Sequence, residues 1–326
     1  VNKQWRYSMY DVTATGELLI DFTRNGLSEQ NNRIYEANPG GAPCNVLAML
    51  GKLGYKTAFI GKVGEDEFGK LLKNTIIEQK IDASGLILDP NAKTTLAFVD
   101  NDETGDRSFS FYRKPGADMM LKEDEVNYEL IDNCRIFHFG SLSMTDEPVR
   151  SATYAMIDYA KKKNKIISFD PNLRPPLWES EELAAKQIWY GIEQCDILKI
   201  ADNEIEWLTG TDDYDKGIAI IRQRTHAKLI NVTLGPNGSI AYYGDHKVFM
   251  EPYLNENTIE TTGAGDTFGA CALHAVLKNG LDNMAEEDLK EMLQFANAAA
   301  SLVTTKKGAL RVMPEEKEIK ELMNKN

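Results

Sequence analysis

The segment 260–269 reads ETTGAGDTFG. Its glycines suit the binding of a phosphate group, whereas its aspartate, Asp266, would repel one. Closely spaced glycines let several backbone N–H groups point at one anion. The residues that follow predict a helix, and a helix N-terminus also favours anions. A carboxylate in such a turn would repel phosphate, so the presence of Asp266 calls for a chemical reason.

Phosphoryl transfer from ATP to an alcohol supplies that reason, because it needs both a phosphate cradle and an acceptor for the hydroxyl proton. Gly263, Ala264 and Gly265 could cradle the transferring group, while Asp266 faces the hydroxyl as general base. A purely structural interpretation is that Asp266 caps the new helix through Thr267. The turn by itself leaves both interpretations open.

Two other polar stretches contain groups that Mg²⁺–ATP and an alcohol would need. Asn203 and Glu206 lie three residues apart, on one face of a predicted helix, and could hold Mg²⁺ through water. The alternative for this pair is a solvated helix surface. Segment 170–176, DPNLRPP, contains three prolines and predicts a stiff loop, which either presents Arg174 to a ligand or is simply solvated.

Two glycine-containing turns could approach a ligand closely. The segment TLGPNG, 233–238, could pass beneath a nucleotide, or it could be a plain turn between two strands. Gly40 and Gly41 precede a predicted helix that has Asn45 in its first turn. Paired glycines at that point would allow a small polyol to reach the backbone, although an ordinary strand-to-helix turn would look the same.

Strand-like and helix-like segments alternate along the chain, and they must bring these groups together. Apolar runs such as RIFHFG, KIISFD, DILKIA and KLINVTLG are separated by amphipathic stretches such as EPVRSATYAMIDYAKKK. Strands too apolar to have a solvated face indicate a parallel sheet covered by helices on both sides. Ligands bind beyond the carboxyl ends of such strands, so we expect Asp21, at the end of the strand-like VTATGELLIDF, on the same rim.

Two segments interrupt this alternation. KTTLAFVD and RSFSFYRK flank the turn-like NDETG and predict a hairpin over 94–113, and NNRIYEANP is another polar, strand-like piece. We expect a small separate sheet, formed by about 22–38 and 92–115, that serves as a lid or a dimer contact. It would be inserted in a single domain spanning 1–326. The alternative is an ordinary hairpin at the edge of the main sheet.

The composition excludes several classes of partner. The formal net charge of −13 argues against binding nucleic acid or an anionic membrane, and no uncharged run is long enough to span a bilayer. The four cysteines form no C-x-x-C pair and the four histidines have no ligand-like spacing, so we expect free thiols. Free thiols, together with a first segment that lacks an apolar stretch, predict a cytoplasmic protein.

Two other nucleotide motifs are matched only in part. GEDEFGKL, 64–71, follows the P-loop spacing up to Lys70, but Leu71 stands where Ser or Thr must bind Mg²⁺, and the acids in the loop would repel phosphate. We therefore expect a helix start there. GAGDTFG also resembles the dinucleotide fingerprint, but it lies near the C-terminal end rather than after the first strand of a βαβ unit, which argues against a dehydrogenase.

Taken together, the motifs resemble those of a known family. ETTGAGDTFGACALHAVL resembles the C-terminal signature of the ribokinase-like (PfkB) carbohydrate kinases, and NPGGAPCNVLAMLGKLG followed by FIGKVGEDEFG resembles their N-terminal signature. The resemblance extends from Val12 to Pro314, and GELLIDF, FYRKPGADMML and SFDPNLRPPLW look most like the fructokinases of the family. It implies a three-layer α/β/α sandwich with a mainly parallel sheet and a small β lid. The implied reaction converts D-fructose and ATP to fructose 6-phosphate and ADP.

The resemblance also implies a role for individual residues. Asp266 would be the base, Gly263, Ala264 and Gly265 would form an anion hole, and Glu206 would bind Mg²⁺ through water. The implied sugar contacts are Asp21, Gly40, Gly41, Asn45 and Arg174, with Phe98 and Arg113 from the lid. The implied contacts to the nucleotide and its metal are Asn203, Glu206, Thr233, Gly235, Gly238 and Asn297.

One residue departs from the family pattern. Many members have Asp where this chain has Glu260, and there the carboxylate helps to hold a monovalent cation beside the anion hole. The longer side chain could still reach such an ion, with carbonyls from TTKKGALR, or it could displace it, so the dependence on K⁺ stays open.

The substrate and the assembly also have alternatives. A kinase of the same family for 2-keto-3-deoxygluconate, ribose or adenosine is the first rival, and a non-catalytic sugar-binding regulator is the second. A structural or interaction protein would leave the polar rim unexplained. Lid sheets in this family often pair into homodimers, so the resemblance also implies a second copy of the chain as a partner.

Overall fold

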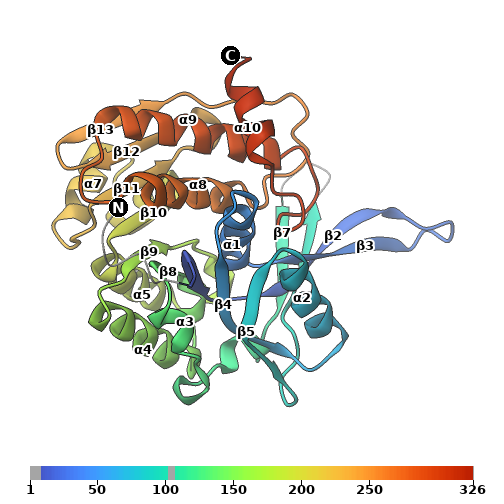
Figure 1. Cartoon of the computed structure of the whole chain (residues 1–326). Coiled ribbons are helices and arrows are strands. Elements are labelled where there is room, and N and C mark those ends of the chain that lie inside the picture. Colours follow the sequence, from blue (N-terminus) through green and yellow to red (C-terminus); the bar gives the residue numbers. More distant parts are fainter. Residues whose placement is uncertain (1–8, 102–106, 326) are drawn as a thin grey trace.

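A nine-stranded sheet forms the centre of the computed structural model, which describes residues 9–101 and 107–325 (Figure 1). Seven neighbouring strands are parallel, and β12 runs antiparallel to both of its neighbours. The strand order is β13 (His246–Met250), β12 (Ser239–Tyr243), β11 (Leu229–Thr233), β10 (Ile197–Ala201), β9 (Ile166–Asp170), β8 (Ile136–Gly140), β1 (Val12–Thr15), β4 (Thr57–Gly64) and β5 (Ile81–Asp89).

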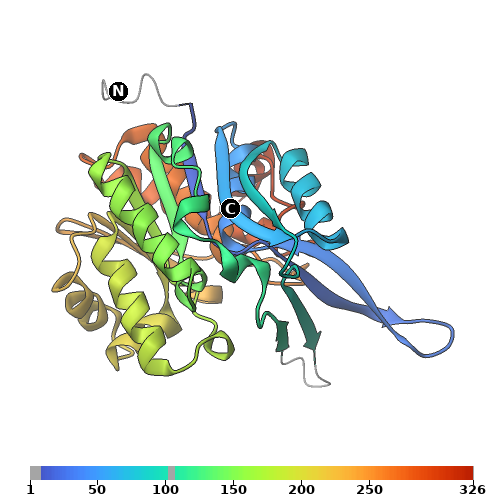
Figure 2. The ribbon, with the colours of Figure 1, turned by 90° about the horizontal axis from the view of Figure 1, so that it is seen from below.

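Helices cover both faces of this sheet, so the predicted three-layer sandwich is confirmed (Figure 2). None of the helices in the described part of the chain is long and apolar enough to cross a membrane. One face packs against α1 (Ala42–Lys52), α2 (Glu67–Glu78), α8 (Ala264–Asn279), α9 (Glu286–Val303) and α10 (Glu316–Met323). The other face packs against α3 (Glu129–Asp132), α4 (Val149–Lys162), α5 (Glu181–Gln194), α6 (Asp202–Thr209) and α7 (Tyr214–Arg222).

The apolar strands are explained by burial on both faces. In β4 every residue is buried, and successive side chains point to opposite faces, so that Phe59 belongs to one core while Ala58 and Ile60 belong to the other. The four cysteines are all buried free thiols, as the sequence predicts.

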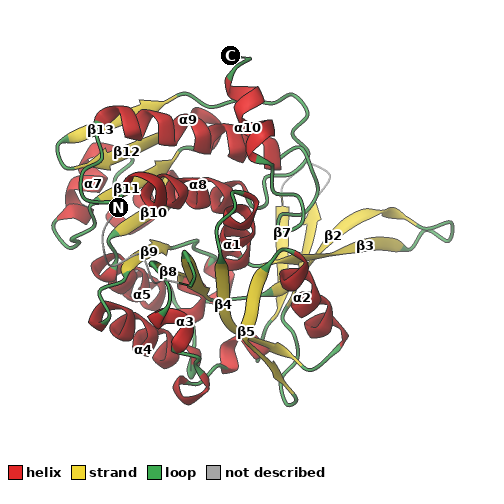
Figure 3. Ribbon diagram, in the orientation of Figure 1, coloured by secondary structure: helices red, strands yellow, loops and turns green. Residues whose placement is uncertain are grey.

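A second, four-stranded sheet projects from the sandwich (Figure 3). Its order is β3 (Arg33–Gly40), β2 (Leu19–Leu27), β6 (Leu96–Asn101) and β7 (Arg107–Tyr112). We call it the small sheet. The predicted hairpin is confirmed as the antiparallel pair β6–β7, although most of its expected turn lies outside the described residues.

The prediction that VTATGELLIDF forms one strand is wrong. The chain turns at Gly16, which has φ of +149° and where a Cβ would lie 2.6 Å from Cγ of Pro43. The first half becomes β1 of the central sheet, and the second half becomes β2 of the small sheet. Asp21 therefore reaches the rim on the small sheet and not at the end of a central strand.

Replacing Gly191 in α5 with Ala should destabilise the fold. A Cβ at this position would lie 2.4 Å from Cζ of the fully buried Phe169, and overpacking of this kind costs about 1–3 kcal/mol. Gly269 in α8 is the matched control, because a Cβ there meets nothing within 4 Å, so Gly269→Ala should be neutral or stabilising by up to about 1 kcal/mol. Urea unfolding of both variants measures the difference, and equal effects would contradict the packing argument.

Candidate active site

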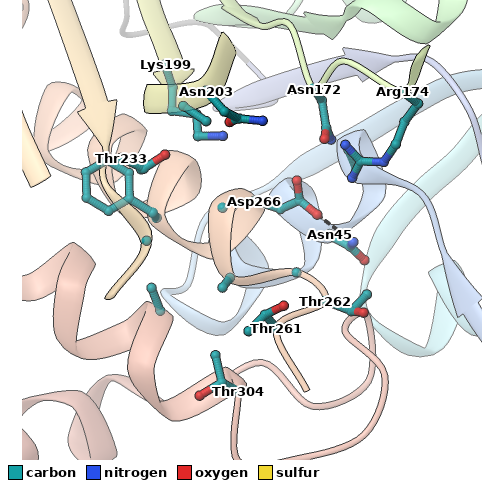
Figure 4. Close-up of a pocket in the computed structure, with 18 of the residues that line it drawn as sticks. Asn45, Asn172, Arg174, Lys199, Asn203, Thr233, Thr261, Thr262, Asp266 and Thr304 are labelled. Atoms are coloured by element: carbon teal, nitrogen blue, oxygen red, sulfur yellow. Dashed lines mark hydrogen bonds between the residues drawn. The ribbon is translucent and has the colours of Figure 1, made fainter. Parts of the chain in front are cut away.

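A cavity of about 940 Å³ lies where the small sheet meets the carboxyl ends of the central strands (Figure 4). Its walls come from β2, β6 and β7 of the small sheet, from β10 and β11 of the central sheet, and from the first turns of α1, α6 and α8. The predicted rim is thus a real enclosure, and its polar groups come from segments far apart in the sequence.

The start of α8 forms the floor of this cavity. Gly263 adopts the left-handed conformation, with φ of +79°, and its carbonyl accepts the Thr267 amide at 2.8 Å. Helix geometry leaves the first amides of a helix without an acceptor inside it, which here include those of Gly265 and Asp266. The cavity therefore meets N–H groups that have no acceptor within the helix, at its positive end.

The Asp266 carboxylate is held at this point by a buried hydrogen bond. Nδ2 of Asn45, in the first turn of α1, donates to Oδ2 of Asp266 at 2.7 Å. Burial raises the pKa of Asp266, while the Asn45 hydrogen bond and the charges of Lys199 and Arg174 oppose that rise. The carboxylate thus contacts another helix and faces the cavity, and the first turn of α8 has no side-chain cap, which disfavours the interpretation of Asp266 as a cap.

Two further carboxylates line the cavity near the small sheet. Burial raises the pKa of Asp21 to about 7, partly opposed by Arg174 and reinforced by Glu260, Glu17 and Asp266. Burial also raises the pKa of Glu17 to about 7, and its Oε1 accepts the Ala42 amide at 2.8 Å. Glu17 was not predicted as a site residue, although a charged residue inside the apolar GELLI was an available signal.

The two glycines before α1 have different roles. Gly41 lines the cavity with φ of +126°, and a Cβ there would lie 2.4 Å from the Glu17 carbonyl oxygen. Gly40 is not part of the lining, and a Cβ on it would lie 2.4 Å from Oδ2 of Asp21. The sugar contact expected at Gly40 stays a prediction, and in this structure the glycine makes room for the Asp21 carboxylate.

The lid contact expected at Phe98 also stays a prediction. Its ring stacks on Phe22 at a centroid distance of 4.8 Å, and it does not line the cavity. Side chains alternate along a strand, so the next residue, Val99, faces the cavity, together with Phe111 on β7. The β6–β7 hairpin forms a wall of the cavity with the face that carries Val99 and Phe111, and not with the face that carries Phe98.

Arg113 likewise lies outside the cavity lining. Its Nε donates to Oδ2 of buried Asp118 at 2.7 Å, Nη1 donates to Oγ1 of Thr145 at 3.0 Å, and Nη2 donates to the Leu142 carbonyl at 2.7 Å. These bonds occupy the guanidinium and anchor the end of β7 to the sandwich, while the expectation that Arg113 covers the sugar stays a prediction.

The other end of the cavity contains most of the residues expected near a nucleotide, namely Asn203, Thr233, Gly235, Gly238 and Asn297. Gly238 has φ of +96°, and a Cβ there would lie 2.2 Å from the Met250 carbonyl oxygen. Tyr253 and Leu254, which the sequence analysis did not identify, form an apolar wall beside them.

The amide of Asn297 is already occupied within the protein. Its Oδ1 accepts from Oγ of Ser239 at 2.8 Å, and its Nδ2 donates to the carbonyl of Glu251 at 2.9 Å and to that of Met250 at 3.3 Å. Asn297 therefore holds the segment after β13, which forms the apolar wall, while its expected contact with the nucleotide stays a prediction.

The two predicted metal-binding acids lie outside the cavity lining. Glu206 is exposed on α6, one turn beyond Asn203, while Asp202 lines the cavity in its place. Oε2 of Glu260 accepts the Gly308 amide at 3.4 Å, and the Glu260 amide donates to the Thr304 carbonyl at 3.1 Å. The Glu260 side chain thus reaches the loop TTKKGALR, 304–311, whose carbonyls were expected to bind a monovalent cation together with Glu260.

Two cations face these carboxylates. The guanidinium of Arg174 points into the cavity from the proline-rich loop, beside Asn172 (Figure 4). Lys199 lies in the middle of β10 and forms a buried ion pair with Asp170 at 3.1 Å. The sequence analysis missed Lys199, and its only signal was one charge inside the apolar strand DILKIA.

Comparisons with known proteins identify relatives over most of the chain. A family model described as pfkB family carbohydrate kinase matches residues 9–316. The probable fructokinase-2 of Arabidopsis thaliana is 42% identical over 305 residues, which cover 93% of this chain and 92% of that protein. Fructokinase-1 of Zea mays is 40% identical over 316 residues, which cover 96% and 98%.

Solved structures show the same similarity. The fructokinase of Xylella fastidiosa with bound ATP superposes with a TM-score of 0.88 at 30% identity, covering 97% of this chain and 98% of that one. A double mutant of the fructokinase of Vibrio cholerae O395, in a form with fructose, ADP and potassium ion bound, gives a TM-score of 0.86 at 29% identity, covering 97% and 99%.

Replacing Asp21 with Asn should stabilise the fold by an amount that grows with pH. An unfolded aspartate titrates near 3.9, whereas burial raises the folded pKa of Asp21 to about 7. The wild type therefore loses stability relative to the variant between about pH 4 and pH 7, as the unfolded chain releases a proton that the folded chain retains. Above about pH 7 the difference levels off.

Thermal unfolding at pH 5, 6, 7 and 8 measures this difference. The control is Asp245→Asn, which makes the same replacement at an exposed position. A difference in melting temperature between Asp21→Asn and wild type that stays constant over this range would contradict the assignment.

Proposed function

The chain belongs to the pfkB family of carbohydrate kinases, and on that premise we propose that it transfers the γ-phosphoryl group of ATP to D-fructose, yielding fructose 6-phosphate and ADP. It is a phosphotransferase with an alcohol group as acceptor. The observation that carries the proposal is the Asp266 carboxylate, held 2.7 Å from Asn45 at the start of a helix whose first amides face the same cavity.

The sugar occupies the end of the cavity formed by β2, the first turn of α1 and the proline-rich loop. Asp21 accepts hydrogen bonds from sugar hydroxyls, Arg174 and Asn45 donate to them, and Gly41 lets the ring approach the backbone. A hydroxymethyl group held there points its oxygen at the γ-phosphorus, and Asp266 accepts its proton as the new O–P bond forms and the bond to the β-phosphate breaks. The raised pKa of Asp266 makes the carboxylate a stronger base.

The amides of Gly265 and Asp266 lie on the opposite side of the transferring group. They donate to the oxygens on which negative charge develops, which is the role of an anion hole. The nucleotide extends from there toward Thr233, Gly235 and the apolar wall that Asn297 supports.

Mg²⁺ and a monovalent cation complete this proposal. The oxygen atoms of Asp202 and Asn203 at the cavity rim suit Mg²⁺ held through water, with Glu206 one turn further along α6. When bound with ATP, Mg²⁺ would neutralise charge on the phosphates. The contact of Glu260 with the loop at Gly308 suits K⁺ near the start of α8, in line with the potassium-bound Vibrio cholerae relative.

We also infer that the small sheet acts as a lid and joins two copies of the chain. Val99 and Phe111 cover the sugar end and exclude water, which limits wasteful hydrolysis of ATP. Three large apolar side chains of this sheet, Leu27, Ile34 and Tyr112, are 52%, 42% and 66% exposed, so a second copy has apolar surface to cover. The buried free thiols also favour a reducing compartment such as the cytoplasm.

Fructose should be the preferred acceptor in a panel that also contains ribose, 2-keto-3-deoxygluconate, adenosine and glucose. ADP release measured by a coupled assay for each compound checks this, with product identity from NMR of the phosphorylated sugar. A clear preference for another acceptor would reject fructose while leaving sugar kinase activity intact, and failure of every acceptor would reject the kinase.

Asp266→Asn should lower kcat by about 10²- to 10⁴-fold, because the hydroxyl proton then has no positioned acceptor. The Asn side chain keeps the size of Asp, so the affinities for fructose and ATP should stay within a few-fold of wild type in calorimetry. Melting temperature serves as the folding control. A variant that loses folding and both affinities together would mean that Asp266 is structural.

A further inference from the structure

Lys199 is a buried cation whose place in the fold is not explained by packing. It stands in β10 among apolar residues, is 9% exposed and faces the cavity. Its Nζ lies 3.2 Å from Oδ1 and 3.1 Å from Oδ2 of Asp170, which ends the neighbouring strand β9. Buried ion pairs contribute little net stability compared with well-packed apolar residues, so this pair has no evident structural advantage.

The ammonium group lies directly beside the proposed anion hole. A Cβ built on Gly265 would lie 3.1 Å from Nζ of Lys199 and 3.7 Å from its Cε. Gly265 is part of α8 and does not have the positive φ that would by itself require glycine. Any larger residue at 265 would press on the lysine, so the absence of a side chain lets the ammonium approach the amides at the start of the helix.

The surroundings of Lys199 leave it charged and able to exchange partners. Burial would lower its pKa, but the carboxylates of Asp170, Glu204 and Asp266 raise the pKa of Lys199 above its ordinary value. Glu204 is bound to the amides of Leu173 at 2.7 Å and Ala201 at 2.9 Å, so Asp170 is the carboxylate that holds the ammonium. An ammonium has three N–H donors, and one carboxylate partner leaves capacity for a phosphoryl oxygen.

We propose that Lys199 donates a charged hydrogen bond to the transferring γ-phosphoryl group and that Asp170 is the positioning residue that aims it. This inference rests on the proposed kinase function of the same cavity. As the bond to the β-phosphate breaks, negative charge spreads over the three oxygens of the phosphoryl group, and the ammonium beside Gly265 stabilises it. The hydroxyl proton still goes to Asp266, and Lys199 transfers no proton.

A structural role for Lys199, in which it only neutralises Asp170, predicts a different result in a double variant. Lys199→Met alone leaves the Asp170 carboxylate buried without its partner, so it should lower the melting temperature whichever role is correct. Lys199→Met combined with Asp170→Asn removes both charges and should recover the melting temperature. In the double variant, a purely structural role predicts a wild-type kcat, whereas donation to the phosphoryl group predicts a lower kcat.

The experiment measures kcat, the KM values for fructose and ATP, and melting temperature for wild type, Lys199→Met, Lys199→Arg and the double variant. We expect the double variant to fold like wild type, to keep its KM for fructose within a few-fold, and to lose about 10²- to 10³-fold in kcat, the loss typical of one anion-hole donor. Lys199→Arg should retain more activity than Lys199→Met because it keeps the charge. The control Lys228→Met, at a half-exposed lysine bound to Asp282, should behave like wild type.

The outcomes separate this inference from the proposed function. A double variant with wild-type kcat would overturn the role of Lys199 while the wild-type activity on fructose stands. A selective rise in the KM for fructose at unchanged kcat would also overturn it, by assigning Lys199 to sugar binding. If wild type phosphorylates another acceptor in the panel, the same comparison is made with that acceptor, and if it phosphorylates none, both proposals fail.

Discussion

The hydrogen bond between Asn45 and Asp266 is the contact on which the site depends. The two residues are 221 positions apart in the chain, and each lies in the first turn of a helix on the same face of the sheet. Because both helices begin at the cavity, this one bond fixes the base relative to the sugar end and to the amides of α8. Either helix alone would leave a carboxylate beside an anion site without a fixed orientation.

The cavity concentrates charge that the fold must tolerate. Burial raises the pKa of four carboxylates at or beside the cavity, Glu17, Asp21, Asp170 and Asp266. Arg174 and Lys199 are cations that line the same cavity. Such groups destabilise the folded chain, and the two apolar cores on either side of the sheet compensate for them. The same burial that opposes stability raises the pKa of Asp266 and makes it a better base, so stability and activity are in conflict at this point.

The β6–β7 hairpin of the small sheet is attached to the sandwich by polar contacts at both of its ends. At the start of β6, Asp66 accepts the Thr94 amide at 2.9 Å, and at the end of β7, Arg113 pairs with Asp118 at 2.7 Å. Thr95 also donates to Asp118, so both roots meet at one buried carboxylate. These contacts hold the wall formed by Val99 and Phe111 over the cavity, which explains why an arginine expected at the sugar is used as an anchor.

The sequence by itself determined the layers of the fold and the groups with local signatures. The alternation of apolar strands and amphipathic helices, the glycine turn before Asp266 and the glycines before Asn45 are all encoded by neighbouring residues. Tertiary structure alone decided that the chain turns at Gly16 into another sheet, that Phe98 faces away from the cavity and that Lys199 faces into it. Local periodicity shows which residues are buried and that successive side chains of a strand point to opposite faces. It does not show which sheet a strand joins or which face meets the ligand, because those depend on pairing partners far away in the chain.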